Sequence, residues 1–520
     1  MEVDAATMMG VGICVAFVII LLTKALNWLW LEPKRAERFL REQGLKGNSY
    51  TLFFGDIKPM TTMLKTAKSK PININDDVVP RLTPFLHQLL KIYGKNSFSW
   101  YGPKPTVNIM DPEAIKEVLN RIHDFPKPTY NPLAKFLITG LVDLEGEKWS
   151  KHRKIINPAF NLAKLKLVLP AMYQSCSEMI NEWKMLISEK GTGSCTVDVW
   201  PFVNSLSGDM ISRTAFGSSY EEGRKVFQLQ KEQAELTAKV LLSVYVPGWR
   251  FVPTKLNKRM KEIEYEIRNV LRGIVQKQEA AMKTCKAAND NLLGLLLESN
   301  QKEIEDNGQN KNVGMNTDDV INECKLFYFA GQETTSVLLN WTMVLLSRFP
   351  NWQTLAREEV IEIFGTKEPD YDGLNRLKVV TMILCEVLRL YPPVTAITRV
   401  VQKETKVGNL TLPTGALAIV PTILVHHDCD LWGNDVKEFK PERFSEGVLK
   451  ATNGQVSFLP FGWGPRICIG QNFALLEAKM ALCLILQNFF FELSPSYIHA
   501  PITVITVQPQ FGTPIILHKL

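Results

Sequence analysis

The sequence predicts a mainly helical protein with small β-sheets and a single transmembrane helix at its N-terminus. Residues Ala5–Leu22 carry no charge, and about 20 apolar residues in a helix suffice to span a bilayer core. Residues Asp318–Arg348 contain no proline and only one glycine, Gly331, which indicates one core-crossing helix of about 30 residues. Segments rich in β-branched residues are short and few. They are residues 106–110, 396–401, 416–423 and 502–507.

The residues that flank the apolar run predict its orientation in the membrane. Trp28 and Trp30 suit the headgroup interface. Acidic Glu2 and Asp4 precede the run. The basic residues that follow it are Lys34, Arg35, Arg38 and Arg41. The positive-inside rule then places the rest of the chain in the cytosol. The alternative, a cleaved signal peptide, requires a basic start and a small-residue cleavage site, and neither is evident.

We expect three segments along the chain. They are a membrane anchor over residues 1–31, a basic linker over residues 32–50 and a compact body over residues 51–520. Within the body, Asp111 followed by proline predicts the start of a helix. Residues Lys255–Thr284 predict a charged amphipathic helix, and the polar stretch Ser299–Asn316 predicts an exposed loop.

Composition and cysteine content exclude several classes of protein. Hydrophobic residues make up 46% and charged residues 22% of the chain, which is typical of a globular protein and not of a disordered one. The net charge is only +7 and no long basic run occurs, so a nucleic-acid partner is not expected, whereas an acidic membrane surface remains possible. The nine cysteines are scattered and form no C-x-x-C pair, which argues against a disulfide framework or a zinc ribbon.

Cys468 lies in a loop that suits a metal-binding thiolate. Two glycines and a proline precede it in residues 461–470, FGWGPRICIG, and a strong helix former follows. A helix dipole and free N–H groups favour a thiolate there, and Arg466 adds a positive charge suited to a carboxylate such as a haem propionate. The alternative is a buried structural cysteine beside a turn. The match of the whole segment to F-x-x-G-x-R-x-C-x-G argues against that alternative.

With this motif the chain resembles the cytochrome P450 superfamily, the membrane-anchored haem-thiolate monooxygenases. The resemblance covers essentially the whole chain and implies the cytochrome P450 fold. It implies a haem b whose iron is ligated by Cys468, in a loop that also supplies Phe461 and Arg466 to the cofactor. The same resemblance implies an oxidoreductase of the endoplasmic reticulum membrane, with its catalytic domain in the cytosol.

Further haem contacts are implied upstream and downstream. Trp149 and Arg153 form a W-x-x-x-R pair on one face of a predicted helix, and the resemblance implies that they reach a haem propionate. Taken alone, this pair would equally fit a surface Trp–Arg stack. Arg399, which lies in a predicted strand, is expected to make another propionate contact.

The long predicted helix carries the sequence AGQETT over residues 330–335. A glycine in mid-helix costs about 1 kcal/mol and the adjacent hydroxyls favour a local irregularity, which would make room for a small ligand. Glu333 and Thr334 are the expected catalytic pair, an acid and an alcohol that deliver protons. The alternative for this sequence on its own is a polar helix face.

Glu386 and Arg389 are spaced as an ion pair on one helical face. The resemblance implies that they form a buried network with Arg443 of the sequence PERF. We assign these three residues a structural role and not a catalytic one.

Electrons are expected to come from a separate protein, because no GxGxxG unit for a flavin or nicotinamide is visible. The implied partner is an NADPH–cytochrome P450 reductase, for which Lys437 and Lys440 are candidate contacts on a basic face. The other expected partners are membrane lipid and a small apolar substrate.

Within the superfamily, the closest likeness is to the plant group that contains secologanin synthase and triterpenoid oxidases. The stretches that carry it include residues 149–160, 323–335 and 459–479. It implies a terpenoid substrate of the iridoid, triterpenoid or gibberellin type. The candidate pocket-lining residues are 131–144, Phe327, Ala330, 394–397 and 504–505. Residues 244–253, VYVPGWRFVP, predict either a second membrane contact or an ordinary buried loop.

Two other functions remain as alternatives. One is a haem-thiolate isomerase or dehydratase that needs no dioxygen, against which the intact Glu333–Thr334 pair argues. The other is a non-catalytic haem- or sterol-binding membrane protein, against which the complete ligand and proton-delivery motifs argue. Dependence of turnover on NADPH distinguishes the monooxygenase from the first alternative, and turnover of any substrate excludes the second.

Overall fold

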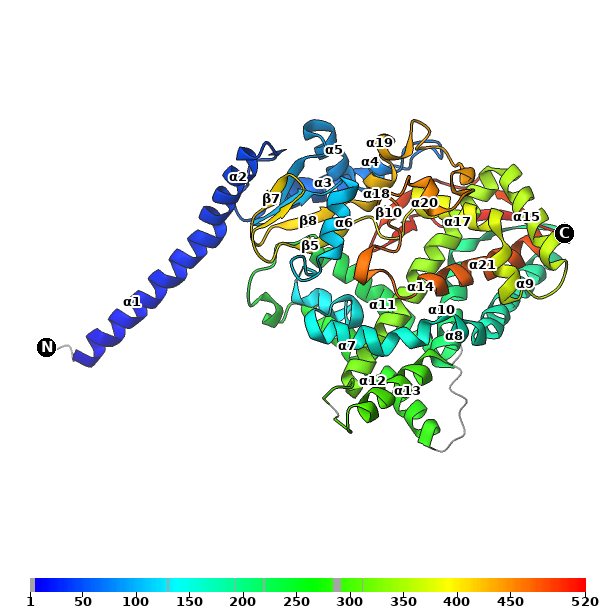
Figure 1. The fold of residues 1–520 in the computed structure, drawn as a ribbon, viewed down its shortest axis with the longest axis horizontal. Coiled ribbons are helices and arrows are strands. Elements are labelled where there is room, and N and C mark those ends of the chain that lie inside the picture. The colour runs from blue at the N-terminus through cyan, green and yellow to red at the C-terminus, as the bar shows by residue number, and fades with distance from the viewer. Residues whose placement is uncertain (1–4, 129–130, 192, 218–219, 284–290, 311) are drawn as a thin grey trace.

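In the computed structural model, the N-terminal helix stands apart from a rounded body (Figure 1). The structure describes residues 5–128, 131–191, 193–217, 220–283, 291–310 and 312–520. Helix α1 (Ala5–Leu26) continues through one π-helical segment, η1 (Asn27–Leu31), into α2 (Glu32–Glu42). Among the described residues, this is the one helix long and apolar enough to cross a membrane, and its apolar window is not buried against the protein.

The segment after the N-terminal apolar helix is packed on the body. The side chain of Leu40 is fully buried. The Tyr50 hydroxyl donates to the Leu29 carbonyl over 2.8 Å. Gln43 exchanges two hydrogen bonds with the backbone of Thr411, at 2.9 and 2.6 Å. No proline-rich hinge separates anchor from body, and these contacts fix the end of the anchor to the sheet region instead.

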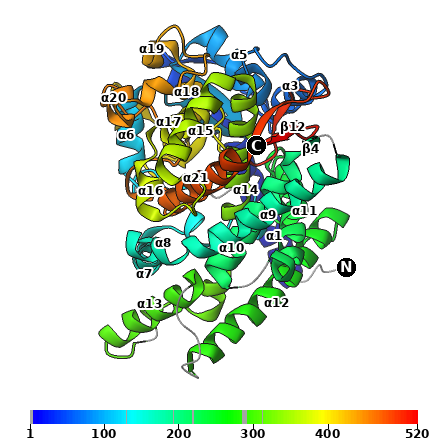
Figure 2. The ribbon, with the colours of Figure 1, turned by 90° about the vertical axis from the view of Figure 1, so that its right-hand side faces the viewer.

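Helices make up most of the body, and α14 (Thr317–Arg348) runs through its centre (Figure 2). A capping box formed by Asn316 and Asp319 begins α14, as the polar residues before its apolar stretch favour. It packs against α10, α12, α17 and α21. The remaining α-helices of the body are α3 (Ile57–Lys68), α4 (Val79–Leu82), α5 (Pro84–Tyr93), α6 (Pro112–Asn120), α7 (Gly146–Ile156), α8 (Leu162–Leu167), α9 (Leu169–Lys190), α10 (Val199–Phe216), α11 (Tyr220–Leu241), α12 (Lys255–Lys283), α13 (Leu292–Asp306), α15 (Pro350–Phe364), α16 (Tyr371–Arg376), α17 (Lys378–Leu390), α18 (Thr422–His426), α19 (Cys429–Trp432), α20 (Val448–Ala451) and α21 (Gln471–Asn488).

The strands form small sheets on the anchor side of the helices (Figure 1) and near the C-terminus. The largest sheet has the order β1-β2-β3-β8-β5, from β1 (Lys46–Gly47), β2 (Ser97–Tyr101), β3 (Lys104–Asn108), β8 (Leu417–Val420) and β5 (Ile397–Val400). A second sheet joins β4 (Ser194–Asp198), β12 (Pro514–Lys519) and β9 (Phe489–Leu493). Two hairpins pair β6 (Thr405–Val407) with β7 (Leu410–Leu412) and β10 (Pro501–Thr503) with β11 (Val507–Pro509).

Most of the predicted elements are confirmed. The helix after Asp111 begins as expected, with the Asp111 carboxylate accepting from the Ala114 N–H over 2.9 Å. Helix α12 matches its predicted range up to Lys283, and Thr284 lies outside the described residues. The expected strand over residues 502–507 is two strands, β10 and β11, joined by a turn.

The prediction of an exposed loop over residues 299–316 is wrong in its first half. Helix α13 extends to Asp306, because the apolar residues before Ser299 are buried and hold its first turns in place. The polar side chain of Asn300, which we expected to be in an exposed loop, instead forms buried hydrogen bonds to the backbone. Its side chain accepts from the Met315 N–H over 2.7 Å and donates to the Met315 carbonyl over 3.0 Å.

Candidate active site

Most of the predicted site residues surround one cavity of about 390 Å³ beside α14. It is bounded by α7, α14, β5 and the loop before α21. The predicted residues that line it are Trp149, Arg153, Thr334, Arg399, Phe461, Arg466 and Cys468. These residues come from four segments that are far apart in the sequence. The fold therefore brings the residues of separate motifs to one cavity.

Cys468 faces this cavity from the loop that leads into α21. Its N–H donates to the Phe461 carbonyl over 2.9 Å. Gly464 has a φ of +72°, and a Cβ there would lie 2.6 Å from the Asn120 side chain, so the turn requires glycine.

Burial raises the pKa of the Cys468 thiol, against the opposing effects of the Gly470 N–H and of the charges on Arg153 and Lys127. In the absence of a bound cation, burial thus opposes the thiolate form that the helix start favours. A cation bound at the sulfur, such as haem iron, would favour the thiolate.

Arg466 is held rigidly at the cavity wall. Its guanidinium donates to the Leu144 carbonyl over 3.0 Å, pairs with Glu145 and lies over the Trp149 ring at 4.5 Å. Its Nε is buried and has no hydrogen-bond partner among the residues that the structure describes. A buried donor without a partner is costly, and a carboxylate in the cavity would satisfy it.

Two further arginines and a lysine add positive charge to the same cavity. Arg153 donates to the Ile467 carbonyl over 3.0 Å, and Arg399 lies on β5. Lys127, which the sequence analysis missed, lines the cavity and donates to the Val142 carbonyl over 2.7 Å. Burial, together with the charges of Arg399 and Arg466, lowers the pKa of Lys127 to about 7.

These residues fit a haem. The thiol at the cavity wall would suit an iron ligand, and the excess of cationic side chains would suit the two propionates. In this arrangement Cys468 would hold the iron, while Trp149, Arg153, Arg399 and Arg466 would hold the propionates.

Helix α14 is α-helical throughout and shows no irregularity at its AGQETT sequence. Gly331 nevertheless lines the cavity at Cys468. A Cβ at this position would lie 2.8 Å from Ile211, so the glycine allows α10 to approach α14 closely. Thr334 lines the cavity, and its hydroxyl donates to the Ala330 carbonyl over 2.8 Å. Such a bond within the helix leaves the hydroxyl oxygen able to accept a proton or a hydrogen bond from the cavity.

The carboxylate of Glu333, in contrast, does not line this cavity. It accepts hydrogen bonds from Thr506 and Gln508 at the β10–β11 hairpin. Burial raises the pKa of Glu333, and the two hydrogen bonds only partly offset this effect. The structure thus separates the two members of the predicted acid–alcohol pair, with the alcohol at the cavity and the acid behind it.

A second buried acid lies at the cavity wall and was missed by the sequence analysis. Glu477 is fully buried, lines the cavity and accepts from the Thr335 hydroxyl over 2.9 Å. Burial raises the pKa of Glu477 well above its usual range, which favours its neutral form. The available signal was an acidic residue between apolar neighbours on the helix that follows the Cys468 loop.

The structural network predicted around Glu386 is present as a buried cluster. Arg389 meets the Glu386 carboxylate with two hydrogen bonds of 2.8 and 2.7 Å, and Arg443 approaches it at 3.5 Å. Arg389 also donates to the carbonyls of His426 and Val436. The cluster therefore connects α17 to the chain segment that precedes the Cys468 loop.

The predicted pocket-lining residues divide between two cavities. The residues that line the cavity at Cys468 are Leu141, Val142, Phe327, Ala330, Val394 and Ile397. Asn131 and Leu133 line a different cavity. Val504 and Ile505 line neither of the two, because the hairpin turn lies over Glu333 instead.

The comparison with solved structures identifies the fold. The retinoic acid-bound cyanobacterial CYP120A1 superposes with a TM-score of 0.74 at 21% identity, covering 92% of this chain and 99% of that one. The family model described as Cytochrome P450 matches residues 79–510. Fold and site together define a haem-thiolate monooxygenase, and the chain belongs to the cytochrome P450 family.

Plant relatives place the chain within that family. Cytochrome P450 CYP72A219 of Panax ginseng is 57% identical over 98% of both chains. Cytochrome P450 72A397 of Kalopanax septemlobus is 59% identical over 96% of this chain and 95% of its own. Cytochrome P450 72A15 of Arabidopsis thaliana is 55% identical over the full length of both. The chain is a plant cytochrome P450 of the 72A subfamily.

Proposed function

We propose that this monooxygenase oxidises a C–H bond of a plant terpenoid of the iridoid, triterpenoid or gibberellin type in specialised metabolism. The observation that carries the proposal is the apolar wall of the cavity at Cys468. Its side chains include Phe160, Leu326, Phe327, Leu338 and Val394. Such a wall binds a hydrocarbon skeleton by the hydrophobic effect and excludes water. The resemblance to the plant group that contains secologanin synthase supports the substrate class.

The side chains around the cavity provide positioning and protons. Haem held by Cys468 supplies the dioxygen chemistry, because a thiolate ligand favours O–O bond cleavage. Thr334 presents its hydroxyl at the cavity and transfers protons there, and Glu333, whose pKa burial raises, is their source behind it. The cationic side chains around Arg466 orient the cofactor by its propionates.

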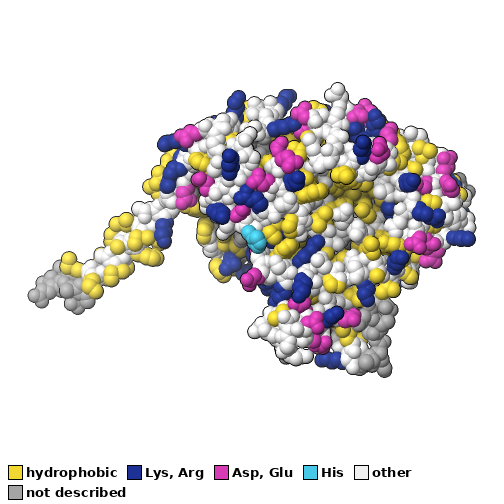
Figure 3. All heavy atoms as spheres, viewed as in Figure 1, with side chains coloured by type: hydrophobic (Ala, Val, Ile, Leu, Met, Phe, Trp, Pro, Cys, Tyr) yellow, Lys and Arg dark blue, Asp and Glu magenta, His cyan; other side chains and the backbone are white. Residues whose placement is uncertain are grey.

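We propose that the anchor holds the protein in the endoplasmic reticulum membrane with the body in the cytosol, where a reductase delivers electrons from NADPH. Apolar side chains run along the protruding anchor, while charges of both signs are intermixed on the visible face of the body (Figure 3). The lysines expected to contact the reductase already have partners. Lys437 pairs with Asp77 at 2.9 Å and Lys440 with Asp435 at 3.0 Å. Because their charges are already paired, these two lysines would attract an acidic reductase surface less strongly.

The test of this function is an aerobic assay in microsomes that contain a plant reductase and NADPH. Iridoid, triterpenoid and gibberellin panels are screened by mass spectrometry. We expect a product heavier by one oxygen atom that is absent without NADPH. A product that forms equally well without NADPH would favour the isomerase alternative. An intact carbon monoxide spectrum without any product would contradict the terpenoid assignment.

Replacing Thr334 by alanine is expected to uncouple the reaction. NADPH oxidation continues, while product formation falls by about a hundredfold, which is the lower end of the usual contribution of general acid–base catalysis. Measuring both rates in the same preparation checks this result. Thr342→Ala is the matched control, because Thr342 makes the same kind of bond within α14 but does not line the cavity. Equal coupling in the two variants would remove the proposed role of Thr334.

A further inference from the structure

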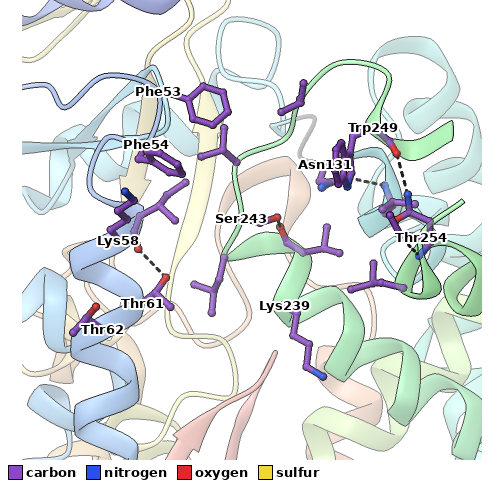
Figure 4. Close-up of a pocket in the computed structure, with 18 residues that line it drawn as sticks. Phe53, Phe54, Lys58, Thr61, Thr62, Asn131, Lys239, Ser243, Trp249 and Thr254 are labelled. Atoms are coloured by element: carbon purple, nitrogen blue, oxygen red, sulfur yellow. Dashed lines mark hydrogen bonds between the residues drawn. The ribbon is translucent and has the colours of Figure 1, made fainter. Parts of the chain in front are cut away.

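The short segment over residues 131–142 lines two different cavities. Asn131, at its start, lines the cavity between α3 and the end of α11 (Figure 4). That cavity also borders residues 244–253, which are exposed over most of their length and do not form a buried loop. The other end of the segment, η3 (Gly140–Val142), contributes two residues to the wall of the active-site cavity. The position of this end therefore shapes the space that a substrate occupies.

A buried acid on α14 holds this part of the wall. Glu323 is fully buried, and its Oε2 accepts from the Leu141 N–H over 3.0 Å. Its Oε1 lies 2.6 Å from Nδ1 of His152, a residue of α7 that is only 1% exposed. Neither side chain lines the active-site cavity itself. One carboxylate thus joins the central helix, the helix that carries Arg153 and the cavity wall.

The backbone of the wall is shaped for this contact. Gly140 has a φ of +62°, and a Cβ there would lie 2.7 Å from the Oε2 of Glu323. The chain brings the Leu141 N–H to the carboxylate because residue 140 has no side chain and adopts this conformation without strain. The Val142 carbonyl accepts from Lys127 over 2.7 Å, so the segment is also held on its other side.

The surroundings of Glu323 and His152 leave the two side chains little freedom. The Nε2 of His152 is buried, has no hydrogen-bond partner within the described residues and lies 3.8 Å from Asp319. Asp319 is in turn paired with Lys148 at 2.6 Å. A shift of the wall away from α14 would leave one oxygen of Glu323 buried without its donor, which is costly. The imidazole and the carboxylate therefore fix each other and the wall in one arrangement.

We propose that Glu323 and His152 are positioning residues that determine which ligands fit the active-site cavity by holding η3 in place. Neither side chain lines the cavity, so both act through Leu141 and Val142, which do. The orientation of an apolar skeleton in the cavity, and hence the carbon that is oxidised, depends on where these two residues stand. The inference rests on the proposed function only in that a substrate occupies this cavity, and it does not depend on the substrate being a terpenoid.

The experiment measures the binding of two haem ligands to the full-length holoprotein by the shift of its haem absorption band. Imidazole is small, whereas clotrimazole is an imidazole that carries three aromatic rings and must pack against the cavity wall. In Glu323→Ala we expect clotrimazole to bind at least about tenfold more weakly, the usual effect of one misfitted methylene in an apolar pocket. Imidazole should bind as it does to the wild type. Both ligands bind the iron directly, so a wrong terpenoid assignment would not affect the result.

Two variants of the pair test whether its members act together. His152→Ala should weaken clotrimazole binding in the same way. The Glu323→Ala/His152→Ala double variant should bind clotrimazole no more weakly than the weaker of the two single variants, because residues of one network are not additive. Additive losses would show that the two residues act separately and would overturn the proposed pair.

Glu323→Gln is the conservative variant. Its amide oxygen can still accept from the Leu141 N–H, and its N–H can donate to His152, since a neutral imidazole can carry its proton on either nitrogen. This variant should keep the wild-type ratio of the two affinities. Gly140→Ala retains both positioning residues but adds a Cβ against the carboxylate, and it should shift the ratio as Glu323→Ala does. It provides the same test if Glu323→Ala does not accumulate as a folded protein.

Asp56→Ala is the matched control for a loss of stability alone. Asp56 is 4% exposed, and its carboxylate likewise accepts from one backbone N–H, that of Trp100, and from one side chain, that of Asn48, both over 2.8 Å. It does not line the active-site cavity. Asp56→Ala should unfold more readily but keep the wild-type affinity ratio. An unchanged ratio in Glu323→Ala, or an equal change in Asp56→Ala, would overturn the proposal. The carbon monoxide spectrum of each variant confirms that haem is bound.

Discussion

Cys468→Ala is expected to abolish the carbon monoxide band of the reduced protein that is characteristic of a thiolate ligand. Product formation should fall more than about a hundredfold, because changing even a residue that merely supports a metal ligand costs about 10- to 100-fold. The fold should survive, since the Cys468 backbone bond to Phe461 does not depend on the side chain. The difference spectrum and circular dichroism of the same preparation measure these two properties separately.

The control for this variant is Cys429→Ala, which removes an exposed cysteine on α19 that does not line the active-site cavity. It should retain both the spectrum and the activity. Persistence of the thiolate-type band in Cys468→Ala would show that another residue ligates the iron. If circular dichroism shows that Cys468→Ala lacks helical structure, Cys468 is required for folding.

Glu386→Ala is expected to destabilise the body by about 3–5 kcal/mol, as breaking a buried ion pair usually does. The change leaves the fully buried guanidinium of Arg389 without its carboxylate. It also removes the acceptor of the Lys440 N–H, which bonds Glu386 over 3.0 Å. Domains are stable by only about 5–15 kcal/mol in total, so little holoprotein should accumulate. Denaturant unfolding of the purified variant measures the loss.

Glu442→Ala provides the comparison, because Glu442 is exposed on the neighbouring segment η6 (Pro441–Phe444). An exposed substitution of this kind should change the unfolding free energy by no more than about 0.5 kcal/mol. If both variants unfold at the same denaturant concentration, the cluster around Arg389 does not stabilise the protein as inferred.

Local patterns in the sequence predicted the elements that depend on neighbouring residues. The uncharged run indicated the anchor, and the absence of proline over residues 318–348 indicated α14 as a single helix. The glycines before Cys468 indicated its turn, which Gly464 indeed forms with a positive φ. Each of these features rests on backbone geometry or on hydrophobic length, and both can be recognised within one segment.

Long-range contacts account for what the sequence did not indicate. The Thr335–Glu477 bond joins residues 142 positions apart, and the Thr506–Glu333 bond joins residues 173 positions apart. No local pattern specifies that Glu333 accepts from the hairpin while Glu477 lies at the cavity wall. The low pKa of Lys127 likewise arises first from burial and then from the charges on Arg399 and Arg466, and only the folded chain produces both.

The sequence by itself thus determined the apolar N-terminal helix, the central helix and the cysteine loop. The tertiary structure decided which acid and which cations lie at the cavity beside Cys468. The physical reason is that burial and electrostatic interaction are set by distance in space, and residues distant in sequence acquire those distances only when the helices pack.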